Sequence, residues 1–133
     1  LEKAVERIEI CSEVPKEAQS LVLIVDDPDA PGGNLPAGRQ AFTHWVVFNI
    51  PPATLQILEN SAPEGSVEGS TDFGKTGYGG PCPPSGTLRY FFKLFALDSV
   101  LSVPEGGSRT EVEEAMEDHI LDKTQTIGLY SRT

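Results

Sequence analysis

The sequence predicts a mainly β domain. Three apolar runs rich in β-branched and aromatic residues, 21–25, 41–50 and 87–97, are bounded by turn residues, which favours strands over helices. The chain also holds 11 Pro and 13 Gly, which indicates many turns and few long helices. Its 133 residues are enough for one domain with a real core, and neither an internal repeat nor a domain boundary is visible.

The first half of the chain is expected to supply three strands. Charged residues alternate with Ile8 and Ile10, which favours a strand over residues 5–11. Residues 21–25 are apolar at every position, as in a strand that is buried on both faces. The next clear strand spans residues 41–50 and is stopped by two prolines.

Three segments between these strands are irregular. Residues 26–40 contain three prolines and are expected to form a loop. Residues 54–58 fit a short helical turn. Residues 59–85 carry six glycines and four prolines, and a loop this long in a compact domain is usually functional or disordered. Its aromatic residues Phe73 and Tyr78 favour order.

The last third of the chain predicts a strand, a helix and a final strand. In the strand 87–97, one face should carry Tyr90, Phe92, Leu94 and Ala96, and the other Phe91, Phe95 and Leu97. Thr110 and Glu113 form a capping box that begins a helix ending near residue 123. The apolar stripe of this helix would be Val112, Met116 and Ile120. Residues 126–131 fit a final strand.

Charge and composition argue against two classes of protein, those that bind nucleic acid and those that span a membrane. The net charge is −10, from 20 acidic and 10 basic residues, and such a field repels a nucleic-acid backbone. No apolar run approaches the ~20 residues that cross a bilayer, and no signal-peptide pattern is visible. We therefore expect a cytoplasmic protein, with a periplasmic or secreted location left open. Cys11 and Cys82 have no metal-binding spacing; free thiols and a single disulfide both stay open.

Candidate functional residues gather where two strands meet one loop. Asp27 and Asp29 follow the strand 21–25, and His44 directly precedes the apolar run 45–48 of the next strand, so neighbouring strands would bring carboxylates and an imidazole to one rim. Each residue also has a structural explanation. Asp beside Pro commonly caps a turn, and a lone histidine in a strand usually makes its hydrogen bonds within the fold. His119 is expected to be structural, and two distant histidines do not make a zinc site.

Two enzymatic interpretations are weaker. Residues 69–76, GSTDFGKT, match the phosphate-binding pattern GxxxxGK[ST], but the Gly- and Pro-rich segment that follows cannot continue as a helix. Its glycines either form an anion-binding nest or simply allow a tight loop. In a hydrolase, an aspartate would orient His44 as the base, but no nucleophile elbow is present. The candidate nucleophiles would be Ser85, Thr76 and Tyr90.

Four short motifs follow one another along the chain: DPDAP at 27–31, HWVVFNIP at 44–51, DFGKTGYGGPCPP at 72–84 and RY at 89–90. Together they resemble the phosphatidylethanolamine-binding protein family, which includes Raf kinase inhibitor protein, and most of all its small bacterial and archaeal branch. The resemblance implies a single domain over residues 1–133, with a large antiparallel sheet packed on smaller strands, a few short helices and one C-terminal helix.

The resemblance also implies a non-enzymatic protein without a cofactor or metal, whose small pocket binds an anion such as a phosphate or a phospholipid headgroup. By this resemblance the pocket residues are Asp27, Asp29, His44, Gly80, Pro81 and Tyr90. A carboxylate beside His44 would raise the pKa of the imidazole and favour the cation that holds the anion. The alternative function is a protein-interaction module that modulates a kinase or protease. A homodimer stays open.

Two features depart from the family pattern. Leu88 stands where the family usually has a histidine, before Arg-Tyr. The loss of one donor to a charged group is typically worth ~1.5–3 kcal/mol, so we expect weaker anion binding or a more apolar ligand. The segment before Val14 is also shorter than is usual in the family.

Overall fold

The computed structural model is built around one five-stranded antiparallel sheet with the strand order β5-β3-β2-β6-β7. It describes residues 7–9, 14–27, 42–58, 61–71, 76–77 and 87–131. The strands of this sheet are β2 (Ser20–Asp27), β3 (Phe42–Ile50), β5 (Val67–Glu68), β6 (Thr87–Leu97) and β7 (Ile120–Ser131). The predicted mainly β fold is confirmed.

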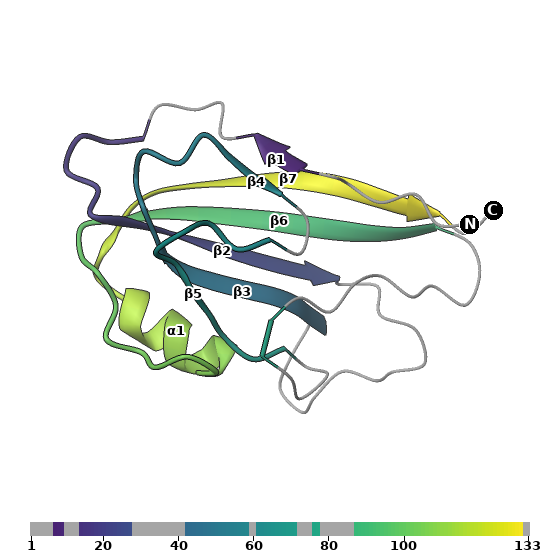
Figure 1. The fold of residues 1–133 in the computed structure, drawn as a ribbon. Helices are drawn as coiled ribbons and strands as arrows, with labels where there is room; N and C mark the ends of the chain where they lie inside the picture. Colours follow the sequence, from purple (N-terminus) through teal and green to yellow (C-terminus); the bar gives the residue numbers. More distant parts are fainter. Residues whose placement is uncertain are drawn as a thin grey trace.

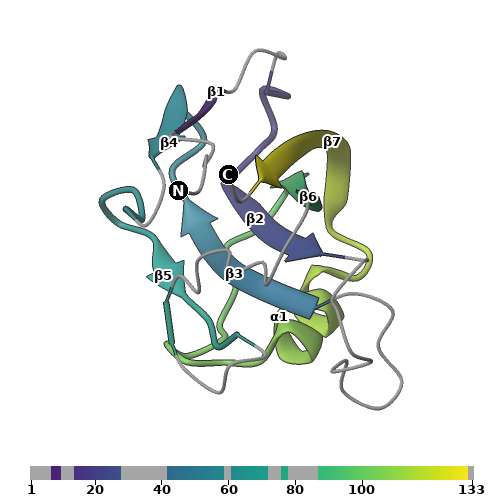
Figure 2. The same cartoon turned by 90° about the vertical axis from the view of Figure 1, so that its right-hand side faces the viewer.

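A second, smaller sheet and one helix cover the two faces of the large sheet. The small sheet pairs β1 (Arg7–Glu9) with β4 (Gln56–Leu58), and the helix is α1 (Arg109–Met116). Figures 1 and 2 show the small sheet on one side of the large sheet and α1 on the other. Two apolar clusters fill the spaces, one containing Ile57 of β4 and the other Val112 and Met116 of α1.

Strand β2 lies at the centre of the large sheet, between β3 and β6. Its alternate residues divide between the two clusters: Leu21, Leu23 and Val25 join the cluster under the small sheet, and Val22 and Ile24 join the cluster under α1. All eight residues of β2 are buried. The expected burial on both faces is confirmed, and the reason is that the strand has a neighbour on each edge and a layer on each face. The alternation predicted for residues 92–97 of β6 is confirmed as well.

Strand β3 has two irregularities that its sequence does not announce. The pairing with β2 shifts between Val25–Trp45 and Asp26–Thr43, so His44 is an extra residue on β3. A second shift lies at Asn49, whose φ is 55°. The side chain of Asn49 donates to the Leu101 carbonyl at 2.9 Å and accepts from the Leu101 amide at 2.7 Å. These two bonds compensate for a backbone conformation that is uncommon outside glycine.

The helix is shorter than the sequence predicted. It begins after the N-cap Ser108, whose capping box is completed by Glu111, not by Thr110 and Glu113. It ends at Met116, and Asp118 then adopts a left-handed φ of 67°. The expected extension to residue 123 is therefore wrong, because those residues begin β7, which pairs with β6 along almost its whole length. The final strand starts at residue 120 instead of 126.

Two smaller expectations are also corrected. Residues 56–58 form β4 rather than a helical turn, because β1 pairs with them through an antiparallel register. The loop expected from residue 26 does not begin there, since Asp26 and Asp27 still belong to β2, and residues 28–40 lie outside the described residues. Within the described part of the chain, α1 is the single helix, and no helix is long and apolar enough to cross a membrane.

Candidate functional site

The rim expected from the sequence lies at the end of β2 and the start of β3. Asp27 is 1% exposed and His44 is 5% exposed, and both residues have interaction partners. The two strands are paired neighbours, with Asp27 opposite Phe42 and Asp26 opposite Thr43. The structure therefore brings the Asp27 and His44 segments together, as predicted.

The irregular pairing at His44 is the local device that shapes this rim. An extra residue in one strand bends it and re-aims its side chains, and such bulges are frequent beside functional sites. Here the bulge keeps Trp45 in register with Val25 while Thr43 comes opposite Asp26. His44 lies at the bend, next to the point where β2 ends. The sequence indicated the strand but not the bulge, because a bulge depends on how the partner strand is registered.

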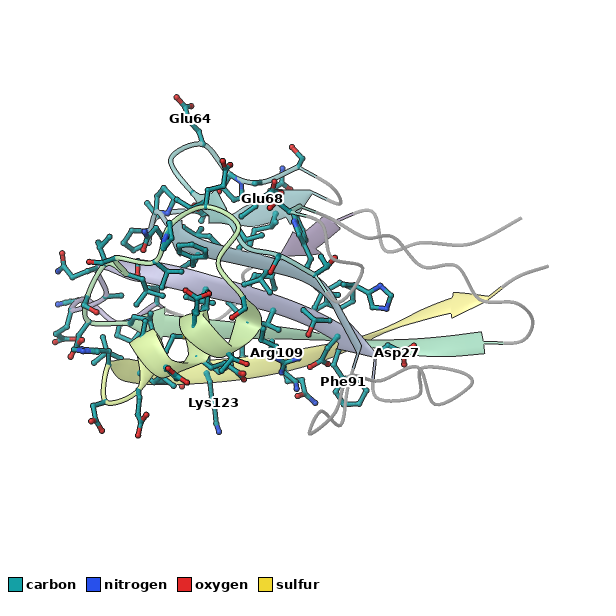
Figure 3. The ribbon with its side chains drawn as sticks, turned by 90° about the horizontal axis from the view of Figure 1, so that it is seen from below. Asp27, Glu64, Glu68, Phe91, Arg109 and Lys123 are labelled. Atoms are coloured by element: carbon teal, nitrogen blue, oxygen red, sulfur yellow. The ribbon has the colours of Figure 1, made fainter. Side chains whose placement is uncertain are left out.

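The neighbouring aspartates at the end of β2 point to opposite faces of the sheet. Successive strand residues alternate, so Asp26 continues the face of Ile24, which α1 covers, and Asp27 continues the face of Val25. Figure 3 shows Asp27 at the end of β2. Asp27 and Asp26 thus lie on two different faces of the sheet although they are adjacent in sequence.

On the α1 face, Asp26 is fully buried and holds two cations. Its Oδ2 lies 2.8 Å from Nζ of Lys93 on β6 and 2.8 Å from Nη1 of Arg109 on α1. Arg109 also donates to Oγ1 of Thr43 at 3.1 Å, and its Nε lies 3.4 Å from Oε2 of Glu113. This network ties α1 to the ends of β2 and β3. Burial of a carboxylate is tolerated because it is paired with opposite charge.

A polar contact also fixes Trp45, the residue after His44. Its Nε1 donates to Oε1 of Glu68 on β5 at 2.9 Å. Gly69 follows Glu68 and lies so close to a neighbouring loop that an added Cβ would come within 2.6 Å of the Gly107 carbonyl oxygen. Glycine is needed here for the close approach of two backbones. The edge strand β5 is thereby held against β3, beside the bulge.

The remaining predicted pocket residues are only partly described. Asp29, Gly80 and Pro81 lie outside the described residues, as do Cys11 and Cys82. Leu88 and Tyr90 are described through their backbone in β6, opposite Tyr130 and Gly128 of β7. Because Phe91 pairs with Asp26, the backbone of Tyr90 lies at the level of Asp27, on the strand next to it. This placement agrees with a shared rim; the Tyr90 side chain stays a prediction.

Three other sequence interpretations are addressed by the described residues. In the segment 69–76, Thr76 pairs with Ser70 in an isolated bridge and does not start a helix, which agrees with rejecting a nucleotide-phosphate loop. His119 lies beyond α1 and not on it, and its Nδ1 is 2.7 Å from Oδ1 of Asp98, which agrees with a structural role. Within the described residues, no three acidic, histidine or cysteine side chains gather to hold a metal.

Sequence reasoning missed the partners of Asp26. One signal was present: Lys93 interrupts the apolar run FFKLFAL, and a lysine inside a buried strand usually has an acidic partner. The second signal is the period-2 spacing from Ile24 to Asp26, which places the carboxylate on the face opposite to that of Asp27. Arg109 could not be found in this way, because the packing of α1 determines where its side chain reaches.

Comparison with known proteins agrees with this geometry. The family model described as phosphatidylethanolamine-binding protein matches residues 9–131. A UPF0098 protein from Methanothermobacter thermautotrophicus is 52% identical over 124 residues, covering 90% of this chain and 78% of the relative. The crystal structure of a homologue from Chlamydia trachomatis superposes with a TM-score of 0.82 at 39% identity, over 92% of this chain and 78% of the other.

A second solved structure, YbcL from Escherichia coli, is described as a member of the mammalian family. It superposes with a TM-score of 0.73 at 30% identity, over 90% of this chain and 76% of that chain. The match to the family model covers nearly all of the sequence, and the fold is shared with both solved relatives. The chain belongs to the phosphatidylethanolamine-binding protein family, in its prokaryotic UPF0098 and YbcL-like branch.

Proposed function

We propose that this protein is a non-enzymatic binder of a small anion, a phosphate or a phospholipid headgroup, at the rim formed by Asp27 and His44. The observation that carries the proposal is the burial of a carboxylate and an imidazole on paired strands, at a bulge, in a member of this family. Buried polar groups on paired strands are well suited to binding, because little order has to be gained when the ligand arrives.

The division of labour at the rim follows from charge. Asp27 repels a phosphate, so the groups that hold the anion are the His44 imidazole and the amides of the glycine-rich loop. Asp27 is suited to orienting the imidazole and to accepting hydrogen bonds from an amine. A zwitterionic headgroup that carries both a phosphate and an ammonium would use both roles. This arrangement also lets an anion bind despite the overall charge of −10.

The chain contains only two histidines, which gives a direct test with an internal control. Inorganic phosphate is titrated into the wild-type protein while the imidazole signals are followed by NMR. We expect the His44 signals to move and saturate, and those of His119 to stay in place, because His119 is bound to Asp98 on the surface. His44→Ala should abolish binding, whereas His119→Ala should retain it. Unmoved wild-type His44 signals would contradict the proposed pocket.

The two other function classes give different results. A protein-interaction module should show an unoccupied rim and recover a stable partner in a pull-down experiment. A hydrolase should turn over a generic ester, and the turnover should vanish in His44→Ala. The replacement of the family histidine by Leu88 argues against chemistry that needs two imidazoles.

A further inference from the structure

A groove of about 420 Å³ lies on the α1 face of the large sheet, away from the face to which Asp27 points. Three elements contribute to it: β6, α1 and β7. The lining residues are Lys93, Phe95, Arg109, Glu113, Lys123, Thr124 and Gln125. The volume lies within the range of small-molecule sites in proteins. Figure 3 looks onto this face and shows Arg109 and Lys123 near one another beside the helix.

The charge of the groove opposes that of the whole molecule. Three of the chain's 10 basic residues line it: Lys93, Arg109 and Lys123. One acidic residue, Glu113, lines it as well, and Asp26 lies buried behind Lys93 and Arg109. The three cations therefore exceed the two carboxylates, in a protein with a net charge of −10. A local excess of positive charge attracts an anion.

The sheet register brings two of these cations to one face. Lys93 pairs with Gln125 and Phe95 pairs with Lys123, so Lys93 and Lys123 occupy diagonal positions on neighbouring strands. Diagonal neighbours lie roughly 7–8 Å apart, which is within reach of long side chains, and two like charges at that separation repel each other. Asp26 compensates Lys93 on its inner side. Among the described residues, no acidic partner within salt-bridge distance faces Lys123.

Unused hydrogen-bond donors also indicate that the groove can bind an anion. The Asp26 contact fixes Lys93 and Arg109, whose side chains are 27% and 11% exposed. That contact uses one N–H of the lysine, and the contacts of Arg109 with other described residues use Nη1 and Nε. In the described part of the structure, Nη2 of Arg109 therefore has donors to spare, and so has Nζ of Lys93. Phe95 adds a half-buried apolar wall.

We infer that this groove is a second binding site, for a small organic anion that carries a phosphate or carboxylate group and an apolar body. The anionic group is held by the free donors of Arg109, Lys93 and Lys123, and the apolar body rests on Phe95. Asp26 acts as the buried anchor that keeps two of the cations in place before the ligand arrives. This site is independent of the rim at Asp27 and His44, which lies on the other side of β2.

The test uses phenyl phosphate and benzoate, which share an aromatic body and differ in the anionic group. Each is titrated into the full chain while the backbone amide signals of Thr124 and Gln125 and the ring signals of His44 are followed by NMR. We expect saturable shifts of the two amides with at least one probe. A preference for phenyl phosphate assigns a phosphate ligand, and a preference for benzoate assigns a carboxylate ligand.

The informative variant is Lys123→Gln, because Lys123 is exposed and takes no part in pairing Asp26, so the fold should be unaffected. Lys16→Gln is the matched control, an exposed lysine in the turn that packs against the opposite cluster. We expect an about tenfold loss of affinity in Lys123→Gln and no change in Lys16→Gln, since one charge-assisted contact is removed. Equal affinity in Lys123→Gln and wild type, or shifts confined to His44, would overturn the inference and leave the rim proposal untouched.

Discussion

Asp26 and Asp27 are chemically identical neighbours with opposite surroundings. Asp26 faces α1, is fully buried and shares one oxygen between Lys93 and Arg109. Asp27 faces the other side, at the rim next to the bulge that contains His44. The strand alternation alone separates them. One carboxylate became a structural anchor, and its neighbour became a candidate ligand-binding group.

This difference separates a carboxylate that stabilises the fold from one that is available for the proposed binding function. The Asp26 carboxylate pairs with Lys93 and Arg109, and through Arg109 it holds α1 against the sheet. Its second oxygen, Oδ1, has no hydrogen-bond partner in the described structure. A buried acceptor left in this state is unusual in proteins, which marks the α1 face as a place where pairing is incomplete.

The largest expected effect comes from Asp26→Asn. The amide keeps the shape but loses the charge, so Lys93 and Arg109 remain partly buried without their shared partner. We expect the free energy of unfolding to fall by about 3 kcal/mol, measured by urea denaturation.

Asp118→Asn is a suitable control for this substitution. Asp118 is exposed, and its left-handed backbone is one that asparagine also adopts. A change within about 0.5 kcal/mol is expected for it. If Asp26→Asn behaved like this control, the anchor role of Asp26 would be refuted.

Asp27→Asn should affect binding instead. Under the proposed function the carboxylate faces the amine of a headgroup, and a hydrogen bond to a charged group is typically worth ~1.5–3 kcal/mol. We expect the affinity for phosphoethanolamine, measured by calorimetry, to fall about tenfold or more. Inorganic phosphate, which has no ammonium group, should bind with little change. An equal loss for both ligands would mean that Asp27 acts on the pocket as a whole and not on the amine.

The smallest effect is expected from Ser108→Ala. Ser108 is the N-cap of α1; its Oγ accepts from the Glu111 amide at 3.1 Å, and Arg109 is the first residue of the helix. Loss of an N-cap side chain costs about 1 kcal/mol. We expect a loss of this size in thermal or urea unfolding, with His44 still responding to phosphate. Ser108→Asn is the control, because asparagine caps helices equally well. Loss of the His44 response in Ser108→Ala would show that the two faces are coupled.

Much of the fold was predictable from sequence because its central strands have strong, period-2 or wholly apolar patterns. Residues 21–25, 41–50 and 87–97 were placed within one or two residues of β2, β3 and β6. The two ends of the helix were harder to predict. The capping pattern S/T-x-x-E occurs twice, at Ser108 and at Thr110, and a spacing of four from Val112 to Ile120 imitates a longer helix.

At the candidate site, Asp27 and His44 were predicted from the sequence because each lies next to a strongly apolar run, 21–25 or 45–48. The contributions of Asp29, Gly80, Pro81 and the Tyr90 side chain remain predictions. The network of Asp26, Lys93 and Arg109 was not found, because its members are separated by 67 and 83 positions from Asp26, and nothing local records their pairing.

The sequence by itself determined the class of fold, the burial of β2 on both faces and the positions of the two rim residues. These follow from local patterns of apolar, glycine and proline residues. Only the tertiary structure decided which strands pair, where β3 bulges at His44, where α1 stops and which aspartate meets a cation. Those features depend on contacts between distant segments, and a strand register becomes defined only when its partner is in place.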